Sequence, residues 1–209
     1  MKLPTPEEYT RDMNGEIIRD VLAEKYLTFQ IGNLSINEDL VGKKTSVSCV
    51  LSVSNLEDEE MIYEVSGDGK GVMDALFNAL VVKLVRDCHS LSNLRLEEFH
   101  ISVDEEDLKK LRRTGRGTDA HVLTMLVINN GCGKLIPFRS RSHSMVAACV
   151  SVVRETVEFF VNSERAVLRF KYLIEDANQR NRGDLYERYA HKLSALVCNT
   201  SYEESLKKG

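Results

Sequence analysis

A glycine-rich turn ahead of an apolar helix pattern is the first segment of this sequence with the chemistry to bind a small anion. Residues 67–71 read Gly-Asp-Gly-Lys-Gly, and apolar residues recur every four positions directly after them. Such a turn exposes backbone N–H groups at the positive end of a helix dipole, which attract a carboxylate. No parallel β-α-β unit surrounds the turn, so it is not a dinucleotide fingerprint, and Lys70 stands in the wrong place for a Walker A loop. The alternative is a tight turn in which the glycines only supply positive φ angles.

A second segment, residues 114–120, has similar chemistry. It reads Thr-Gly-Arg-Gly-Thr-Asp-Ala and ends in Asp119-Ala120, just as the first turn leads to Asp74-Ala75. An acidic side chain beside exposed N–H groups can hold an ammonium next to a carboxylate, which is how an amino acid is recognised. The alternative is a solvated loop in which Asp119 only stabilises a turn.

Basic side chains form a third candidate. Arg139 and Arg141 precede a predicted helix N-terminus, where they are placed to meet a carboxylate or a phosphate. A second basic cluster lies within residues 109–116, but the acidic residues 104–107 stand beside it and no aromatic residues alternate with it. We therefore expect a solvated charged loop there, with nucleic-acid binding as the less favoured alternative.

Histidines and cysteines give no motif for a metal or a nucleophile. The five histidines are scattered without a His-x-His pair, and only His100 and His121 are candidates to meet across strands as a metal site. The five cysteines include no C-x-x-C pair, so we expect free thiols in the core of a cytoplasmic protein. We predict neither a cofactor nor a metal.

Composition fits a soluble protein of one domain or two small ones. The chain has 209 residues, 43% of them hydrophobic and 29% charged, with a net charge of −4. These values exclude wholesale disorder, a collagen repeat and a disulfide scaffold. No run of 18 apolar residues predicts a membrane span, and the first 16 residues lack the apolar segment of a secretion signal.

The hydrophobic pattern predicts an α+β fold in four segments. Residues 1–44 should hold a polar lead-in, a helix over 16–26 capped by Asn14, and a connector with a short strand at 34–36. Residues 45–162 should form two similar strand–strand–helix units, each a sheet packed against a helix. Residues 163–198 should form a helical hairpin, with a break near 181–183, and residues 199–209 a flexible tail.

Within residues 45–162 the pattern predicts the elements in more detail. Period-two alternation indicates strands at 45–53 and 61–65, paired as a hairpin and followed by a helix over 71–89. In the second unit we expect strands at 94–103, 121–129 and 134–138, and a helix from Ser142 or Ser144 to about 162. A phase slip at Glu97-Glu98 predicts a β-bulge in the first of these strands.

The order of these motifs resembles a known family over residues 14–162. The motifs are Glu-Lys-Tyr-Leu at 24–27, Gly-Lys-Gly-Val-Met-Asp-Ala-Leu at 69–76, and Gly-Thr-Asp-Ala at 117–120. Together they resemble the C-terminal regulatory, or dimerisation, domain of 2-isopropylmalate synthase and its citramalate synthase relatives. Val72 stands where that family usually has proline, and residues 137–144 differ from its usual start of the final helix.

The resemblance implies two βββα units about a pseudo-two-fold axis, a homodimer, and leucine or isoleucine bound between the units. The implied ligand-facing positions, with the two arginines added from their placement, are Gly69, Gly71, Asp74, Ala75, Gly117, Asp119, Ala120, Arg139 and Arg141.

The resemblance also implies a non-enzymatic function. The family's catalytic TIM barrel is absent, so the chain is expected to sense a branched-chain amino acid or similar small carboxylate and to modulate a separate catalytic subunit. One alternative is a small enzyme that acts on a carboxylate or phosphate through Arg139, Arg141 and His143. The other is a nucleic-acid-binding module that uses loop 109–116.

Overall fold

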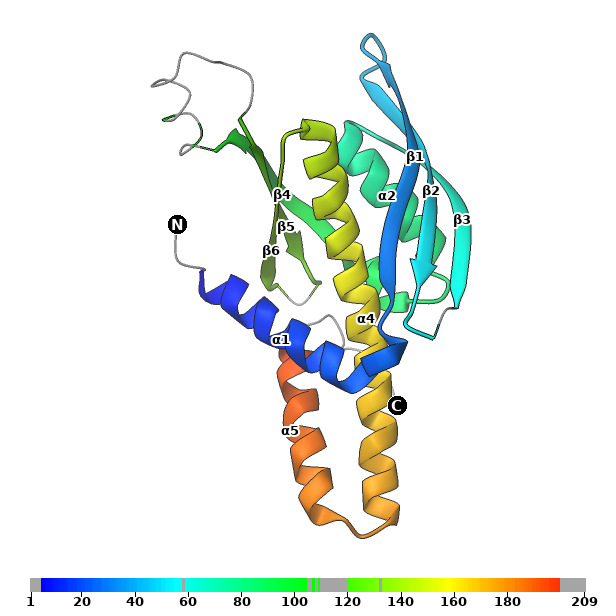
Figure 1. Ribbon diagram of the computed structural model, residues 1–209, viewed down its shortest axis with the longest axis vertical. Helices are drawn as coiled ribbons and strands as arrows, with labels where there is room; N and C mark the ends of the chain where they lie inside the picture. Colours follow the sequence, from blue (N-terminus) through cyan, green and yellow to red (C-terminus); the bar gives the residue numbers. More distant parts are fainter. Residues whose placement is uncertain are drawn as a thin grey trace.

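Two consecutive units of three antiparallel strands and one helix make up most of the chain, as the computed structural model shows (Figure 1). The structure describes residues 5–57, 59–104, 107, 109, 120–131 and 133–199. The strand orders are β1-β2-β3 in one sheet and β4-β5-β6 in the other. These observations confirm the predicted α+β class and the predicted pair of similar units.

The first unit comprises β1 (Thr28–Asp39), β2 (Lys44–Ser54), β3 (Glu60–Gly69) and α2 (Val72–Leu84). The β2–β3 hairpin is confirmed, with every second side chain of β2 buried against the helices. The prediction for β1 is wrong, because a 12-residue strand replaces the expected connector and short strand. Only Phe29 is fully buried in β1, and the apolar alternation breaks between Ile31 and Leu34, where the register with β2 shifts, so no continuous period-two run marks the strand. Pairing with β2 holds it extended.

The second unit comprises β4 (Arg95–Val103), β5 (Val122–Asn129), β6 (Leu135–Ser142) and α4 (Met145–Gln179). The predicted bulge is confirmed, because the β4–β5 register shifts between Leu96 and Glu98. Strand β6 continues four residues beyond the predicted end at 138. Pairing with β5 explains this extension, since Ser140 and Ser142 lie opposite Thr124 and Val122.

Helix α4 corrects the prediction of two helices on either side of residue 162. It runs for 35 residues without interruption, so the expected boundary at 162/163 falls inside one helix. Ser144 caps it, as predicted, by accepting a hydrogen bond from the Ala147 N–H. Helix α5 (Gly183–Asn199) follows, and the predicted break near residues 181–183 is confirmed by the left-handed φ of 53° at Asn181.

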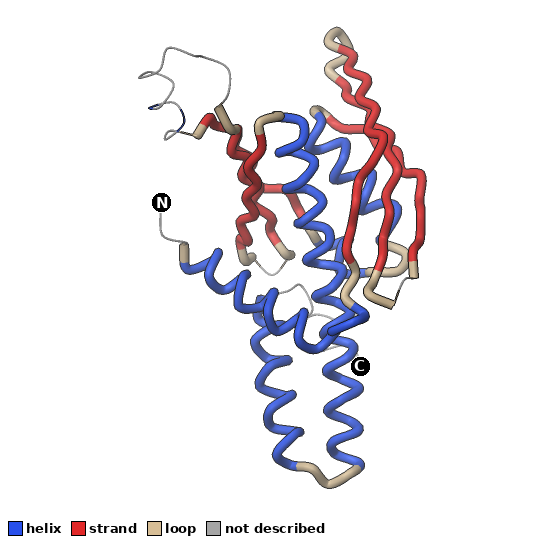
Figure 2. Tube along the Cα trace, viewed as in Figure 1, coloured by secondary structure: helices blue, strands red, loops and turns tan. Residues whose placement is uncertain are grey.

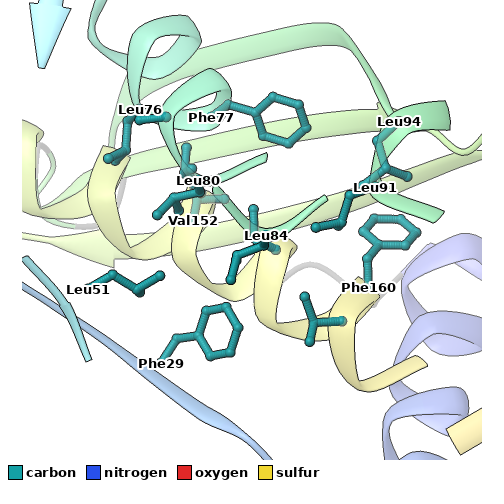
Figure 3. Close-up of a cluster of buried hydrophobic side chains, with 14 of the residues drawn as sticks. Phe29, Leu51, Leu76, Phe77, Leu80, Leu84, Leu91, Leu94, Val152 and Phe160 are labelled. Atoms are coloured by element: carbon teal, nitrogen blue, oxygen red, sulfur yellow. The ribbon is translucent and has the colours of Figure 1, made fainter. Parts of the chain in front are cut away.

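The main hydrophobic core fills the space between the two sheets. Figure 2 shows α2 and α4 between the two groups of strands, and Figure 3 shows the side chains that meet there. Phe29 and Leu51 come from the first sheet, Leu80 from α2, and Val152 and Phe160 from α4, and each is at most 1% exposed. The two units thus share one core and support each other.

A second core joins the ends of the chain. Helix α1 (Pro6–Leu22) crosses α4 and α5, and Ile18 and Leu22 pack there with Phe170 and Leu196. The predicted start of α1 is wrong by ten residues. A capping box marks its true start, because Thr5 and Glu8 exchange hydrogen bonds in the sequence Thr-Pro-Glu-Glu. Asn14, the expected cap, lies buried inside this helix.

Side chains of α4 stand in for a neighbouring strand along the start of β1. Asn162 accepts from the Leu27 N–H at 2.9 Å and donates to the Leu27 carbonyl at 2.8 Å. One turn earlier, Glu158 accepts from the Phe29 N–H, and Arg154 donates to the Phe29 carbonyl. The i, i+4, i+8 spacing of these three α4 residues matches the extended backbone they bind. This ladder fixes α4 against the first sheet.

The described cysteines behave as core residues. Cys49, Cys88 and Cys149 are buried free thiols, whereas Cys132 and the side chain of Cys198 lie outside the described residues. Cys88 donates to the buried carboxylate of Glu164 at 2.7 Å, and burial together with that carboxylate raises the pKa of the Cys88 thiol. Among the helices that the structure describes, none is long and apolar enough to cross a membrane.

Candidate functional site

The glycines of the first turn serve close packing of β3 on α2. A Cβ at Gly69 would collide with the Ala75 N, and a Cβ at Gly67 would lie 2.7 Å from the Ala79 N. Gly71 has open space around it and an extended φ of −167°. The alternative reason of positive φ therefore fails at all three glycines, since the positive-φ glycines described are Gly131 and Gly133. Close approach of backbones is the physical reason for Gly67 and Gly69.

Asp74 holds this turn in place from inside the helix. Its Oδ2 accepts from the Lys70 N–H at 2.9 Å, and its Oδ1 accepts from Asn78 Nδ2 at 3.4 Å. Asn78 also donates to the Asp68 carbonyl at 3.1 Å. The carboxylate lies in the first turn of α2, where the helix dipole favours negative charge. Ala75, the next residue, is fully buried. A ligand ammonium at Asp74 would share the carboxylate with these bonds.

Arg139 and Arg141 lie on β6 and already engage carboxylates. Arg139 Nε is 2.8 Å from Glu8 Oε1, an ion pair that docks α1 onto the second sheet. Arg141 Nη2 is 2.9 Å from Asp104 Oδ2 and 3.2 Å from Asp107 Oδ2. Any ligand anion at these arginines would compete with these acidic side chains.

A polar cluster surrounds Arg141 at the start of β5. Asp107 Oδ2 accepts from the His121 N–H at 3.2 Å and lies 2.6 Å from His121 Nδ1. These bonds, with Arg141 nearby, lower the pKa of Asp107 to about 2. The His143 ring lies against the His121 ring, with centroids 3.7 Å apart. This His–Asp pair is a grouping that the sequence analysis missed, because its members are 14 residues apart on either side of loop 109–116.

His100 and His121, the two histidines considered as candidates to meet across strands, do not lie opposite each other. His100 lies opposite Met125 in the β4–β5 register, and Met125 is four residues, or about 13 Å of extended chain, from His121. Among the described residues, no group of three or more His, Cys, Asp or Glu side chains could hold a metal ion.

The predicted site residues form two separate networks in the described part of the chain. Asp74 bonds within the α2 turn, whereas Arg139 and Arg141 bond to α1 and to the Asp107 cluster. Both helices that follow the sheets, α2 and α4, begin at the same end of the molecule (Figure 1). Ala120 is half-buried next to His121, and Gly117 and Asp119 lie outside the described residues.

A cleft at the end of the second sheet away from the Asp107 cluster was not predicted. It lies between α1, the start of β6 and α4, with a volume of about 330 Å³. We call it the α1–β6 cleft. Its polar wall is a stripe along α1 at the i, i+3, i+4, i+7 positions Glu7, Thr10, Arg11 and Asn14. Its other walls come from Lys134, Leu135 and Ile136 of the β5–β6 segment and from Phe159 of α4.

In comparisons with known proteins, the chain matches no model of a known protein family and no curated protein.

Proposed function

We propose that this chain is a non-catalytic regulatory domain that binds a branched-chain amino acid, or a similar small carboxylate, and modulates a separate catalytic subunit. The observation that carries the proposal is the repeated unit of three strands and a helix. That arrangement agrees with the expectation drawn from the regulatory domain of 2-isopropylmalate synthase, whose motifs the sequence resembles. A coupling of this kind is typically worth about 1–3 kcal/mol between effector and partner.

The effector is proposed to lie at the end of the molecule where α2 and α4 begin. There the α2 dipole and the turn at Gly69 and Gly71 favour a carboxylate, and Asp74 supplies negative charge for an ammonium. Gly117, Asp119 and Ala120 remain the predicted contacts from the second unit. The protein is further proposed to act in the cytoplasm as a homodimer, as the resemblance implies.

A thermal-shift screen of the twenty amino acids and their 2-oxo acids tests this proposal. An effector present at 100 times its Kd stabilises the folded protein by about 2.7 kcal/mol. For a protein of this size that corresponds to a rise in Tm of about 5–10 °C. We expect the rise with leucine, isoleucine or valine, and no rise with any amino acid would contradict the proposal.

Gly71→Ala is the matched variant for locating the effector. Its new methyl group would enter open space, so the fold is expected to be unchanged. A ligand seated on the turn would meet that methyl group and bind more weakly. An unchanged leucine response in Gly71→Ala would place the effector elsewhere while leaving the regulatory role standing.

The described contacts count against the enzyme alternative and do not bear on the nucleic-acid alternative. Arg139 and Arg141, which the enzyme hypothesis assigns to a carboxylate or phosphate substrate, are paired with Glu8 and with Asp104 and Asp107. The nucleic-acid hypothesis depends on loop 109–116, of which the structure describes only residue 109. Steep salt-dependent binding to DNA or RNA would revive that alternative.

A further inference from the structure

Asn14 contributes a buried amide side chain to the lining of the α1–β6 cleft. The residue is 3% exposed, and among the described residues its Nδ2 has no hydrogen-bond partner. Buried amide N–H groups in folded proteins are almost always hydrogen-bonded, because leaving one unpaired costs free energy. Asn14 lines the cleft, so a turn of its side chain toward the cleft would let a ligand there supply the missing acceptor. A donor of this kind selects an oxygen atom.

Arg11 adds positive charge three residues before Asn14 on the same face of α1. Its side chain is 20% exposed, and its guanidinium lies over the Phe138 ring at 5.3 Å from the ring centroid. Hydrogen bonds to Asp12 and to the Pro137 carbonyl use three of its five N–H groups. These bonds fix the plane of the guanidinium, and its remaining N–H groups can bind a carboxylate.

Other charges around the cleft set its selectivity. Lys134 lies on the opposite wall and adds a second cation, whereas Glu7 lies one turn before Arg11 and is exposed. Asp12 pairs with Arg11. Burial raises the pKa of Glu155 on α4, and Arg11 is close enough to oppose part of that rise. These two cations and three carboxylates disfavour a phosphate with two negative charges more than an anion with one.

Apolar side chains make up the rest of the cleft. Leu135, Ile136 and Phe159 form a wall opposite the polar stripe, with Ile136 7% exposed. A volume of about 330 Å³ is at the lower end for ligand-binding pockets. An apolar wall facing a buried amide and a guanidinium suits a molecule with a carboxylate at one end and a short hydrocarbon chain at the other.

We propose that the α1–β6 cleft binds a small organic monocarboxylate, with the carboxylate on Asn14 and Arg11 and the hydrocarbon chain on Leu135, Ile136 and Phe159. This site is independent of the proposed effector site, since it uses neither the α2 turn nor residues 117–120. It joins α1 to the second sheet, so its occupation would strengthen the contact between these two elements.

A titration with 4-methylpentanoate, followed by the ¹⁵N resonances of the protein, tests the site. For eight non-hydrogen atoms a Kd of ~1 mM is expected. The two side-chain amide signals of Asn14 should move with the same Kd as backbone signals of residues 134–136. The neutral 4-methylpentanamide should bind at least about tenfold more weakly, because a hydrogen bond to a charged acceptor is lost. L-Leucine is titrated in the same way, and its Kd shows whether the cleft accepts an ammonium group beside Glu7.

Two variants separate binding from folding. Asn14→Leu keeps the volume and removes the unpaired amide, so it should fold with equal or higher stability and bind 4-methylpentanoate about ten- to a hundredfold more weakly. Thr10→Val is the matched control, because Thr10 lines the same cleft but its hydroxyl donates to the Pro6 carbonyl at 2.8 Å. Thr10→Val should bind as the natural protein does.

Three results would overturn the proposal. They are an absence of binding at 20 mM 4-methylpentanoate, equal affinity for the acid and the amide, and an unchanged Kd in folded Asn14→Leu. Comparison of the acid with the amide needs only the natural protein, so it decides the question even if Asn14→Leu does not fold. A leucine response that is lost in Gly71→Ala but kept in Asn14→Leu would support the effector site alone.

Discussion

Replacing Asn162 with alanine is expected to weaken the protein severely, although this asparagine touches no proposed ligand. Its amide is fully buried and pairs with both the N–H and the carbonyl of Leu27, at 2.9 and 2.8 Å. These two bonds satisfy the backbone N–H and carbonyl of Leu27, where the chain passes from α1 to β1. No helix or strand bond can replace them, because β1 is an edge strand there.

The magnitude follows from the two groups left behind. Leu27 is 8% exposed, so in Asn162→Ala its N–H and its carbonyl lose their partners in a nearly dry environment. Each unpaired buried group costs about 1–3 kcal/mol. Allowing for partial relaxation, we expect a loss of about 2–5 kcal/mol in the free energy of unfolding, a large share of the ~5–15 kcal/mol of a typical domain.

Urea unfolding at pH 7, followed by circular dichroism, measures this loss. Asn178→Ala is the matched control, because Asn178 lies exposed near the end of the same helix and should change stability by less than about 0.5 kcal/mol. Asn162→Asp keeps the shape and the acceptor but cannot donate to the Leu27 carbonyl at pH 7, so it should also be strongly destabilising. A loss below about 0.5 kcal/mol in Asn162→Ala would refute the account of α4 as a substitute strand.

Two further predictions concern the α2 turn and the Asp107 cluster. Gly69→Ala should lower stability by about 1–3 kcal/mol in urea unfolding, because its Cβ would collide with the backbone of α2, whereas Gly71→Ala should be near neutral; equal effects would contradict the packing reason for Gly69. Asp107→Asn should lower the urea midpoint at pH 7. The folded pKa of Asp107, about 2, lies below the unfolded value of about 3.9, so its stabilisation is complete above that value and is lost as the pH falls toward 2. The midpoints of the two proteins should therefore converge between about pH 4 and pH 2, and a constant difference would contradict the assignment.

Elements with a strong local period could be predicted from the sequence. Strand β2 alternates buried and less buried residues along its length, and α2 repeats apolar residues every four positions, so both ends of β2 and the start of α2 were predicted within one residue. The predicted end of α2 at residue 89 is five residues too late. The bulge in β4 between Leu96 and Glu98 is visible in the sequence as a slip in the alternation of that strand. The capping box at Thr5 is also present in the sequence, although Asn14 was predicted as the cap.

Elements that depend on distant partners could not be predicted in this way. Strand β1 has one fully buried side chain and is extended because β2 and the α4 ladder take up its backbone groups. Helix α4 changes partners near residue 162, from the two sheets to α1 and α5. The change of apolar face was therefore mistaken for a helix end.

For the candidate sites too, one part could be predicted from the sequence and another part could not. Residue types alone indicated the anion-binding chemistry of the glycine turn and of Arg139 and Arg141, because exposed N–H groups and guanidinium groups attract carboxylates wherever they lie. Only the tertiary structure decided what these groups contact. In the tertiary structure Arg139 pairs with Glu8, and Asp107 contacts His121. Asn14 Nδ2 has no hydrogen-bond partner among the described residues. The physical reason is that the type of side chain fixes which groups it can bind. Which acceptors and donors actually reach it depends on residues that are far away in the sequence.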